Sequence, residues 1–475
     1  MIDFDLMQHQ KDVIYRSQFE PHLFLAWEMG TGKTCAIIQI LRQLYGNHGA
    51  LRKTLILAPK VVLDNWKDEF KKFSKIPPDY IHVLKGPVKK RAEYFASMDA
   101  FSSIAITNYD ALQSQELTDT IIKWGPDILI CDESHFLKNY QSKRAKNVAK
   151  ISDVSRHKYL LTGTPILNNA MDLFMQYRVL DGGKTFGHNF FVYRSRYFYD
   201  TNAGWKGSKN HFPNWQPREG SQHKLMALMA DNTLRVEKED CMDLPPLIVQ
   251  DAKVELGLEQ RKHYKEMQKY FMTYIKGEVS VAQLAITKAL RLQQIVSGFV
   301  KTDEGKIHRI KKNPRLDALK EYLEILTPNH KVIVWACFKE NYKMIGEICD
   351  KIGIRYAELH GSVNEKDRRE AIRSFNNDAG MRVLIANQGA GGIGINLVSA
   401  TYSIYYSRGF KLGDDLQSAA RNYRRGSEIH DKITRINLVA NETIDGLIAD
   451  ALKLKIDLSN SFLDYIKRNG SKYGL

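Results

Sequence analysis

The segment Trp27–Thr34, WEMGTGKT, decides the fold prediction for the first part of the chain. A short apolar run, LFLA, precedes it, and the segment CAIIQILRQLY after it carries apolar residues at helical spacing. A strand, a glycine-containing loop and a helix in this order form a phosphate cradle, in which main-chain N–H groups and the helix N-terminus hold phosphate oxygens. Trp27 stands where the pattern G-x-x-x-x-G-K-[S/T] has its first glycine, so the alternative is a glycine-rich turn before an ordinary helix.

In the cradle interpretation the residues have separate tasks. Gly30 and Gly32 let the main chain approach the phosphates. Lys33 reaches the outer phosphates, and Thr34 ligates Mg²⁺. The segment therefore predicts a nucleotide site at the end of a strand.

The composition is that of a globular protein with a strong positive charge. The net charge of +16 favours a polyanionic partner, most simply nucleic acid. The longest apolar runs, such as TLILA and KVIVWACF, are too short to cross a bilayer, so we expect no membrane partner. The five cysteines include no C-x-x-C pair, which indicates neither a zinc site nor a disulfide framework. Met1–Gln10 has neither a basic start nor a long apolar core, so we expect no signal peptide.

Short β-branched runs alternate with amphipathic segments in two parts of the chain. The runs of the first part are LFLAW, TLILAP, SIAITNY, DILICDES and YLLTGTP. The second part begins at Asn313 with the helical segment NPRLDALKEYLEIL and continues with KVIVWACF, RYAELHG, MRVLIAN, YSIYYS and RINLVA. Buried parallel strands that end in polar loops are typical of a doubly wound α/β fold. We predict an α/β protein with two lobes, residues 1–180 and 313–475, and an inter-lobe insertion at 181–312 that packs partly with the first lobe.

The insertion has a composition of its own. Residues 186–215 hold ten aromatic residues and four Lys or Arg, with one acid, and residues 258–299 have the pattern of long helices. The aromatic segment could touch DNA bases or form a small core, and we favour the core because dense aromatic residues bury a large area.

The pair Asp132-Glu133 follows an apolar run in DILICDESHFLKN. Adjacent acids at a strand end suit two tasks: one carboxylate holds Mg²⁺, and the other orients and deprotonates an attacking water. The alternative is a solvated acidic turn, but the pair lies in the same predicted lobe as the phosphate cradle, which favours the catalytic interpretation.

Taken in order, the motifs WEMGTGKT, LILAPKVVLDNWKDEFKKF, TNYD, DESHFLKN and LTGTPILNNAMDLF resemble those of the first lobe of superfamily-two helicases, a DEAD/DEAH-like fold. The NW-x-x-EF-x-KF and LTGTP-x-x-N-x-x-x-DLF forms are similar to the Swi/Snf-type branch of DNA-translocase ATPases. GAGGIGINL and QSAARNYRRGS are similar to the fifth and sixth motifs of the second lobe. The resemblance implies two RecA-like lobes. It also removes the objection of the missing glycine, because the family commonly has Asp rather than Gly at this position, although Trp27 itself is unusual there.

The resemblance also implies ATP and Mg²⁺ as cofactors and assigns residues to them. The residues implied to bind the nucleotide are Gln10, Gly30, Thr31, Gly32, Lys33, Thr34, Gly394 and Gln417. Thr34 and Asp132 would hold Mg²⁺, and Glu133 would be the general base. Arg421 and Arg424 resemble arginine fingers, whose planar guanidinium groups stabilise charge on the γ-phosphate, and their spacing predicts one shared helical face. Thr162 and Thr164 resemble the motif that couples the nucleotide site to the nucleic acid.

The nucleic-acid contacts follow from the resemblance in the same way. The positions that match family phosphate contacts are Pro59, Lys60, Asn108, Tyr109, Gly391 and Gly392. Gly389 stands where the family often has Lys, which puts that contact in doubt. His135 and the pair Lys71-Lys72 could be ligands, or a structural histidine and a solvated basic face.

The function expected from these features is an ATP-hydrolysing motor that translocates on double-stranded or branched DNA without sequence specificity. The alternatives are a strand-separating DNA or RNA helicase and a nucleotide-gated binding module without turnover. The spacing from Asn189 through LRVEKEDCMDLPP resembles a distant branch that includes annealing helicases, although Val236 replaces one of its paired arginines. We expect a cytoplasmic monomer from a bacterial or phage-infected cell.

Overall fold

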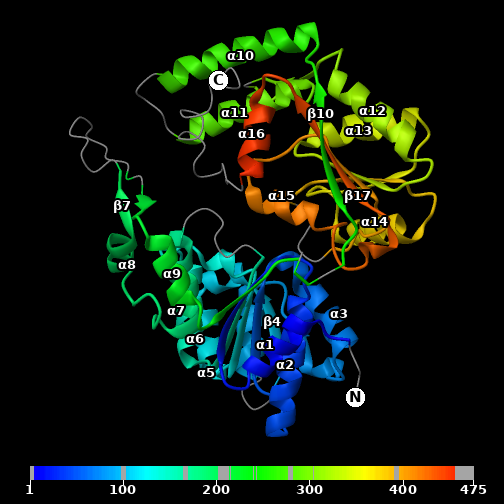
Figure 1. Ribbon diagram of the computed structural model, residues 1–475. Coiled ribbons are helices and arrows are strands. Elements are labelled where there is room, and N and C mark those ends of the chain that lie inside the picture. The colour runs from blue at the N-terminus through cyan, green and yellow to red at the C-terminus, as the bar shows by residue number, and fades with distance from the viewer. Residues whose placement is uncertain are drawn as a thin grey trace. The chain divides into compact units, whose positions relative to one another are not determined.

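The computed structural model describes residues 5–97, 103–163, 170–201, 213, 215–238, 240–241, 243–276, 282–302, 304–389 and 395–454. The chain divides into two compact units, residues 1–242 and 243–475 (Figure 1). The segment 181–312 therefore contributes residues to both units.

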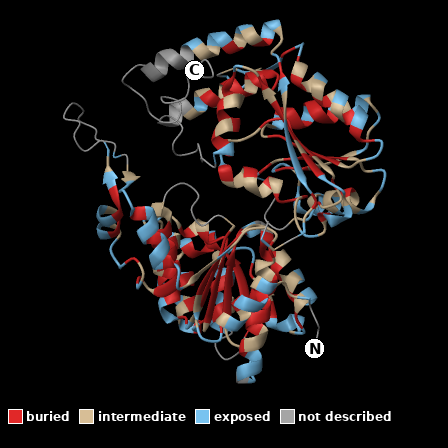
Figure 2. Cartoon of the chain, viewed as in Figure 1, coloured by how far each residue is buried: buried red, intermediate tan, exposed pale blue. Residues whose placement is uncertain are grey.

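The first unit is built on a seven-stranded sheet in the order β3-β4-β2-β5-β6-β1-β9, and every pairing in it is parallel. Its strands are β1 (His22–Trp27), β2 (Thr54–Ala58), β3 (Ile81–Val83), β4 (Ile104–Asn108), β5 (Ile128–Asp132), β6 (His157–Leu161) and β9 (Thr233–Val236). Every residue of β2, β4 and β5 is buried, as expected for strands covered on both faces (Figure 2).

Helices cover both faces of this sheet. The helices on one face, which share a core with the strands, are α4 (Val88–Ser97), α5 (Gln115–Trp124), α6 (Lys143–Val154) and α7 (Leu173–Asp181). The helices on the other side are α1 (Gln8–Arg16), α2 (Lys33–His48) and α3 (Leu63–Phe73) (Figure 1). The predicted strand–loop–helix around Trp27–Thr34 is confirmed, since β1 ends at Trp27 and α2 begins at Lys33.

The aromatic segment joins the core of the first unit. Phe186, Tyr193, Tyr197 and Phe198 are buried in the same cluster as α7, which confirms the predicted core for these four residues, whereas Phe191 and Tyr199 are exposed. The elements of this region are α8 (Phe190–Tyr197), β7 (Phe198–Asp200), β8 (Trp215–Pro217) and α9 (Ser221–Met229).

The second unit has a six-stranded parallel sheet in the order β10-β17-β16-β13-β15-β14. Its strands are β10 (Leu247–Val254), β13 (Val332–Trp335), β14 (Tyr356–Leu359), β15 (Val383–Ala386), β16 (Tyr402–Tyr405) and β17 (Ile433–Ala440). The predicted helix at Asn313 is confirmed: the Asn313 side chain accepts a hydrogen bond from Leu316 N at 3.4 Å and caps α12 (Pro314–Leu326).

The two faces of this second sheet carry separate cores. On one face α12 and α13 (Lys339–Lys351) pack on alternate residues of β13 and β15, and on the other α14 (Glu365–Asn377) contributes Phe375. The remaining elements are α10 (Leu258–Lys276), α11 (Ala282–Val296), β11 (Phe299–Lys301), β12 (Ile307–Arg309), α15 (Leu412–Ala419) and α16 (Ile444–Lys453). The long helices predicted in 258–299 are confirmed as α10 and α11.

Each sheet gains an edge strand from the segment between the predicted lobes. β9 lies parallel to β1, and β10 lies parallel to β17 over eight residue pairs. Across the described residues, no helix is both long enough and apolar enough to cross a membrane.

Candidate functional site

The loop between β1 and α2 has the conformation of a phosphate cradle. Gly30 and Gly32 have positive φ angles of 91° and 83°, which glycine adopts without strain. A Cβ on Gly32 would lie 2.2 Å from Gln10 Nε2, so a larger residue there would displace the Gln10 amide. Lys33, the first residue of α2, donates from Nζ to the carbonyl oxygens of Trp27 (2.8 Å) and Glu28 (3.0 Å). The lysine thus points back into the loop, where a phosphate would meet it.

Trp27 belongs to the strand rather than to the loop. It is the last residue of β1, pairs with Val236 of β9 and is 1% exposed. The His9 ring meets its indole edge-on at 4.6 Å between centroids. A glycine is not needed at this position because the turn begins after it.

Helix α1 holds the loop from outside. Gln10, which is 2% exposed, donates from Nε2 to Gly32 O (3.1 Å) and accepts from Met7 N at Oε1 (3.0 Å). His9 Nε2 lies 2.9 Å from Thr31 O. These contacts fix the Gln10 amide beside the cradle, and an amide retains a second N–H and further lone pairs with which to bind a base.

The acid pair lies at the carboxyl end of β5 in the same unit. Asp132 is the last residue of β5, and its Oδ2 accepts a hydrogen bond from Trp66 Nε1 on α3 at 2.9 Å. Burial, together with the charge of Glu133, raises the pKa of Asp132 to about 6, although the Trp66 hydrogen bond and the Lys33 charge oppose the shift. A carboxyl group in this environment gains from a divalent cation, which favours its ionised form.

Glu133 is buried in a strained conformation. Its φ angle of 51° lies in the left-handed region, which is uncommon for residues other than glycine, and its side chain is 4% exposed. His135 Nδ1 lies 3.3 Å from Glu133 Oε2 and 3.5 Å from Thr162 Oγ1. One imidazole nitrogen therefore connects the acid pair to Thr162, the first residue of the predicted coupling motif. Thr164 lies outside the described residues.

The predicted nucleic-acid positions of the first unit differ in exposure. Tyr109 is 1% exposed, and its hydroxyl donates to Asp132 O at 2.7 Å. Asn108 is 6% exposed, and its Oδ1 accepts from Arg91 Nη1 at 2.7 Å. Pro59 is buried, whereas Lys60 is exposed. Of these four, only Lys60 presents its side chain to solvent, so a ligand would meet the other three mainly through their main chain.

In the second unit Arg421 and Arg424 lie on the turn after α15, which ends at Ala419. The predicted shared helical face is therefore wrong: the helix ends two residues before Arg421, and the chain turns. Arg421 is 4% exposed, and Arg424 Nη1 donates to Ile395 O at 3.4 Å. Gln417 lies on α15, while Gly391, Gly392 and Gly394 lie outside the described residues.

A buried charge cluster under α15 was not predicted. Asp415 of α15 contacts Arg408 Nη2 at 3.0 Å and Arg435 Nη2 at 2.9 Å. Burial alone would raise the pKa of Asp415, but the two guanidinium groups hold it below its ordinary value. Gln388, at the end of β15, donates to the same carboxylate at 3.2 Å. The cluster fixes α15, and so the start of the arginine turn, on the sheet.

The residues that sequence reasoning missed are His9 and Trp66 at the nucleotide site and Arg91 beside Asn108. Each acts through a contact with a residue distant in the sequence, so no local pattern marks it. Trp66 stands inside the motif LDNWKDEF, which was the one available signal.

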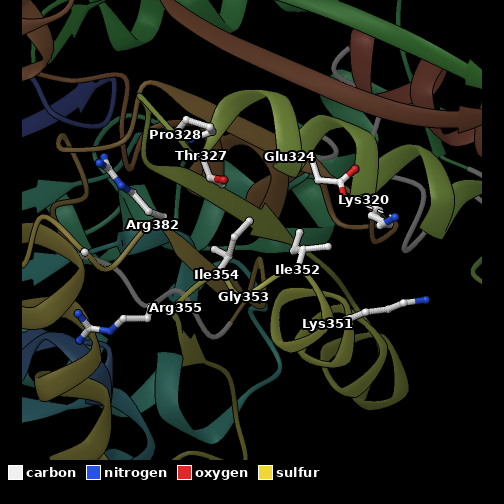
Figure 3. Close-up of a pocket in the computed structure, with 11 residues that line it drawn as sticks. Lys320, Glu324, Thr327, Pro328, Lys351, Ile352, Gly353, Ile354, Arg355 and Arg382 are labelled. Carbon is white, nitrogen blue, oxygen red and sulfur yellow. Dashed lines mark ion pairs between the residues drawn. The ribbon is translucent and has the colours of Figure 1, made fainter.

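A separate cavity of about 590 Å³ lies at the amino-terminal ends of strands β14 and β15 of the second sheet (Figure 3). Arg355 and Arg382, which line it, directly precede β14 and β15, whereas Gln388 follows β15. In Figure 3 the charged ends of Arg355, Arg382 and Lys351 point away from the central Ile352 and Ile354. This cavity is therefore not part of the site built around α15.

The residues of the first unit fit Mg²⁺ bound together with a nucleotide. No cluster of three or more His, Cys, Asp or Glu side chains suited to a metal occurs in the part of the chain that the structure describes. Mg²⁺ in phosphate-transfer sites takes one or two protein oxygens and completes its shell with phosphates and water. Thr34 and Asp132 supply that number of oxygen ligands.

Comparison with protein families gives two matches that together span most of the chain. Residues 13–304 match the SNF2-related domain, and residues 314–426 match the helicase conserved C-terminal domain.

The individual relatives have low sequence identity to this chain and are longer than it is. The CHD3-type chromatin-remodeling factor PICKLE of Arabidopsis thaliana is 26% identical over 94% of this chain and 33% of its own length. An uncharacterized ATP-dependent helicase of Mycoplasma pneumoniae is 28% identical, covering 92% of this chain and 40% of that protein. Human DNA annealing helicase and endonuclease ZRANB3 is 25% identical, and the match covers 97% of this chain and 40% of that protein. This chain thus spans less than half the length of these relatives.

Among solved structures, the chain is similar to the Sulfolobus solfataricus SWI2/SNF2 ATPase core in complex with dsDNA. The TM-score is 0.44 at 22% identity, and the match covers 98% of this chain and 95% of that one.

Proposed function

The chain belongs to the SNF2-related family, and from this premise we propose that it is an ATP-driven motor that moves along double-stranded or branched DNA. The observation that carries the proposal is the joint placement, in one unit, of the Gly30–Lys33 cradle and the Asp132-Glu133 pair. A cradle alone binds phosphates, whereas the acid pair adds what hydrolysis needs. The same observation argues against a binding module without turnover.

The residues of the first unit divide the chemistry between them. The cradle and Lys33 bind the β- and γ-phosphates, and Gln10 orients the base. Thr34 and Asp132 would hold Mg²⁺, which would supply positive charge to stabilise the phosphates. Glu133 accepts a proton from the attacking water. The strained backbone at Glu133 and its burial hold the carboxylate in place for this step.

The arginine turn of the second unit is proposed to take part in hydrolysis. Arg421 and Arg424 would bind the γ-phosphate, where a guanidinium stabilises charge that develops during transfer. Hydrolysis then depends on both units engaging one nucleotide, and this dependence converts turnover into relative movement of the units.

The proposed partner is DNA. The net charge of +16 suits a polyanion, and relatives carry names such as DNA annealing helicase and chromodomain-helicase-DNA-binding protein. Main-chain groups at Pro59, Asn108 and Tyr109 can contact phosphates, and phosphate contacts set position without reading sequence. Gly391 and Gly392 remain proposed contacts in the second unit. A monomeric state, a cytoplasmic location and a division into 1–180, 181–312 and 313–475 remain predictions.

The test is the ATPase rate in the presence of duplex DNA, single-stranded DNA or RNA, with Lys33→Ala as the inactive control. We expect the largest stimulation with duplex or branched DNA. Equal rates with and without every nucleic acid would contradict the proposal, and stimulation by single strands alone would favour the strand-separating helicase.

A further inference from the structure

A cavity of about 420 Å³ lies in the first unit, between α6, α7 and the start of α8. The described residues that line it are Tyr140, Lys146, Ala149, Lys150, Phe174, Met175, Arg178, His188, Asn189, Phe190 and Phe191. Its volume lies within the range of small-molecule sites. Nothing in the nucleotide chemistry described above uses it.

The cavity is cationic. Among the described lining residues there are two lysines, an arginine and a histidine but no carboxylate. Arg178 is neutralised by Asp153 through two contacts of 2.8 Å. Lys150 donates to the amide oxygen of Gln115 at 3.1 Å. Neither Lys150 nor Lys146 forms an ion pair with any residue that the structure describes. The uncompensated charge therefore suits an anionic ligand.

The cavity also has an aromatic wall. Tyr140 and Phe190 stack with their ring centroids 3.7 Å apart, and Phe191 beside them is 58% exposed. The Arg194 guanidinium lies 5.2 Å from the Phe191 ring centroid and so holds one side of it. An exposed aromatic ring next to free lysines is the combination with which proteins bind unpaired nucleotides, because the ring stacks on a base and the lysines meet the phosphate.

Asn189 adds hydrogen-bonding capacity. Its Oδ1 accepts from Phe191 N at 2.8 Å and from Val192 N at 3.3 Å, which fixes the side chain as the cap of α8. The amide N–H groups are donors that can meet the edge of a base.

We propose that this cavity binds one unpaired nucleotide of branched DNA, with its base on Phe191 and its phosphate beside Lys146. The proposal rests on the proposed DNA motor and names a feature of its substrate. In an unbroken duplex every base is paired and stacked, so no unpaired nucleotide is present. A fork, bulge or gap contains an unpaired nucleotide, so the cavity would favour such sites.

The test compares the affinity for an unbroken duplex with that for the same duplex carrying a single-nucleotide DNA bulge of 2-aminopurine, without ATP. Phe191→Ala and Lys146→Ala alter exposed side chains, so the fold should survive both. Each should lower affinity for the bulged duplex about fivefold or more, and Phe191→Ala should also abolish the change in 2-aminopurine fluorescence on binding. Val192→Ala is the matched control, because Val192 is 56% exposed on the same helix but does not line the cavity.

Three outcomes would overturn the proposal. Unchanged affinity for the bulged duplex would exclude the cavity, and an equal loss on the unbroken duplex would make it a simple phosphate contact. An equal loss with a bulge of RNA in place of DNA would remove the DNA assignment. Failure of the motor proposal is measured separately, since wild-type protein would then show no ATPase stimulation by unbroken duplex.

Discussion

The Asp132 carboxylate has a proposed function in its ionised form, but ionisation at this buried position lowers the stability of the folded protein. In the proposed function this carboxylate would be ionised to hold Mg²⁺, yet burial and the adjacent Glu133 raise its pKa to about 6. Trp66 and Lys33 lower that cost through a hydrogen bond and a charge. The protein thus maintains a destabilised carboxylate at the position where the cation is proposed to bind.

The first prediction concerns the stability that this carboxylate costs. Between the ordinary pKa of 3.8 and about 6, the folded protein keeps a proton that the unfolded chain has released, so the free energy of unfolding falls as pH rises through this window. Asp132→Asn removes the charge and should raise the free energy of unfolding at neutral pH by roughly 1–2 kcal/mol. Denaturant unfolding should show this gain shrinking as the pH falls towards the ordinary value. A variant less stable than wild type at neutral pH would contradict the account.

The second prediction concerns Glu133. Glu133→Gln keeps the side-chain size but cannot accept a proton from water, so ATP hydrolysis should fall on the order of 10²-fold or more. ATP affinity, measured with a fluorescent nucleotide, should stay near that of wild type. Wild-type turnover in this variant would show that another group is the base.

At the scale of elements, the predicted strands were those with short β-branched runs. β2, β4 and β5 are wholly buried, so they consist mostly of apolar residues, and this composition alone identifies them as strands. β9 and β10 were missed because edge strands need little burial: the first residues of β10 are exposed, and its sequence LIVQDAKV mixes apolar and charged residues. What defines these two strands is pairing with β1 and β17, which are distant in the sequence.

The residues of the candidate site also divide into those that a local sequence pattern identifies and those that only the fold brings to the site. Glycines, Lys33 and the acid pair form local patterns and could be predicted, whereas Trp66, His9 and Arg91 act across the fold and could not. Arg421 and Arg424 were placed on a helix because R-x-x-R fits helical spacing, but α15 ends at Ala419.

The third prediction concerns the two arginines of α8. Arg194 lies 4.0 Å from the Trp215 ring centroid and packs on the protein, whereas Arg196 is exposed. If this element faces the duplex, Arg196→Ala should reduce the slope of log affinity against log salt by about one, the effect of one lost phosphate contact. Arg194→Ala should chiefly lower stability, by about 0.5–2 kcal/mol. An unchanged salt slope in Arg196→Ala would show that α8 does not contact the DNA and has only a structural role.

At the scale of the whole molecule, the residues proposed to act on the nucleotide are divided between two compact units. Lys33 and the acid pair belong to the first, and Arg421 and Arg424 belong to the second. In the proposed function this division lets the first unit bind the nucleotide, while hydrolysis would also need the arginines of the second unit.

The fourth prediction follows from this division. Arg424→Ala should abolish DNA-stimulated turnover while sparing ATP affinity more than Lys33→Ala does, because only Lys33 lies in the phosphate cradle. Parallel measurements of ATP binding and of ATPase rate with duplex DNA separate the two effects. Full stimulated activity in Arg424→Ala would remove its role as an arginine finger.

The central claim is that the protein moves along duplex DNA without parting its strands. In the proposed cycle the protein would advance along one strand through phosphate contacts, and nothing in that cycle opposes base stacking, worth about 1.4 kcal/mol per step. Branch migration remains possible, since the pairs lost are matched by pairs gained.

The most direct measurement compares displacement of a third strand from a triplex with unwinding of a plain forked duplex by the same protein. The account predicts ATP-dependent triplex displacement that Glu133→Gln abolishes, with the forked duplex left mostly paired. Efficient unwinding of a long plain duplex without triplex displacement would contradict it and identify a strand-separating helicase instead.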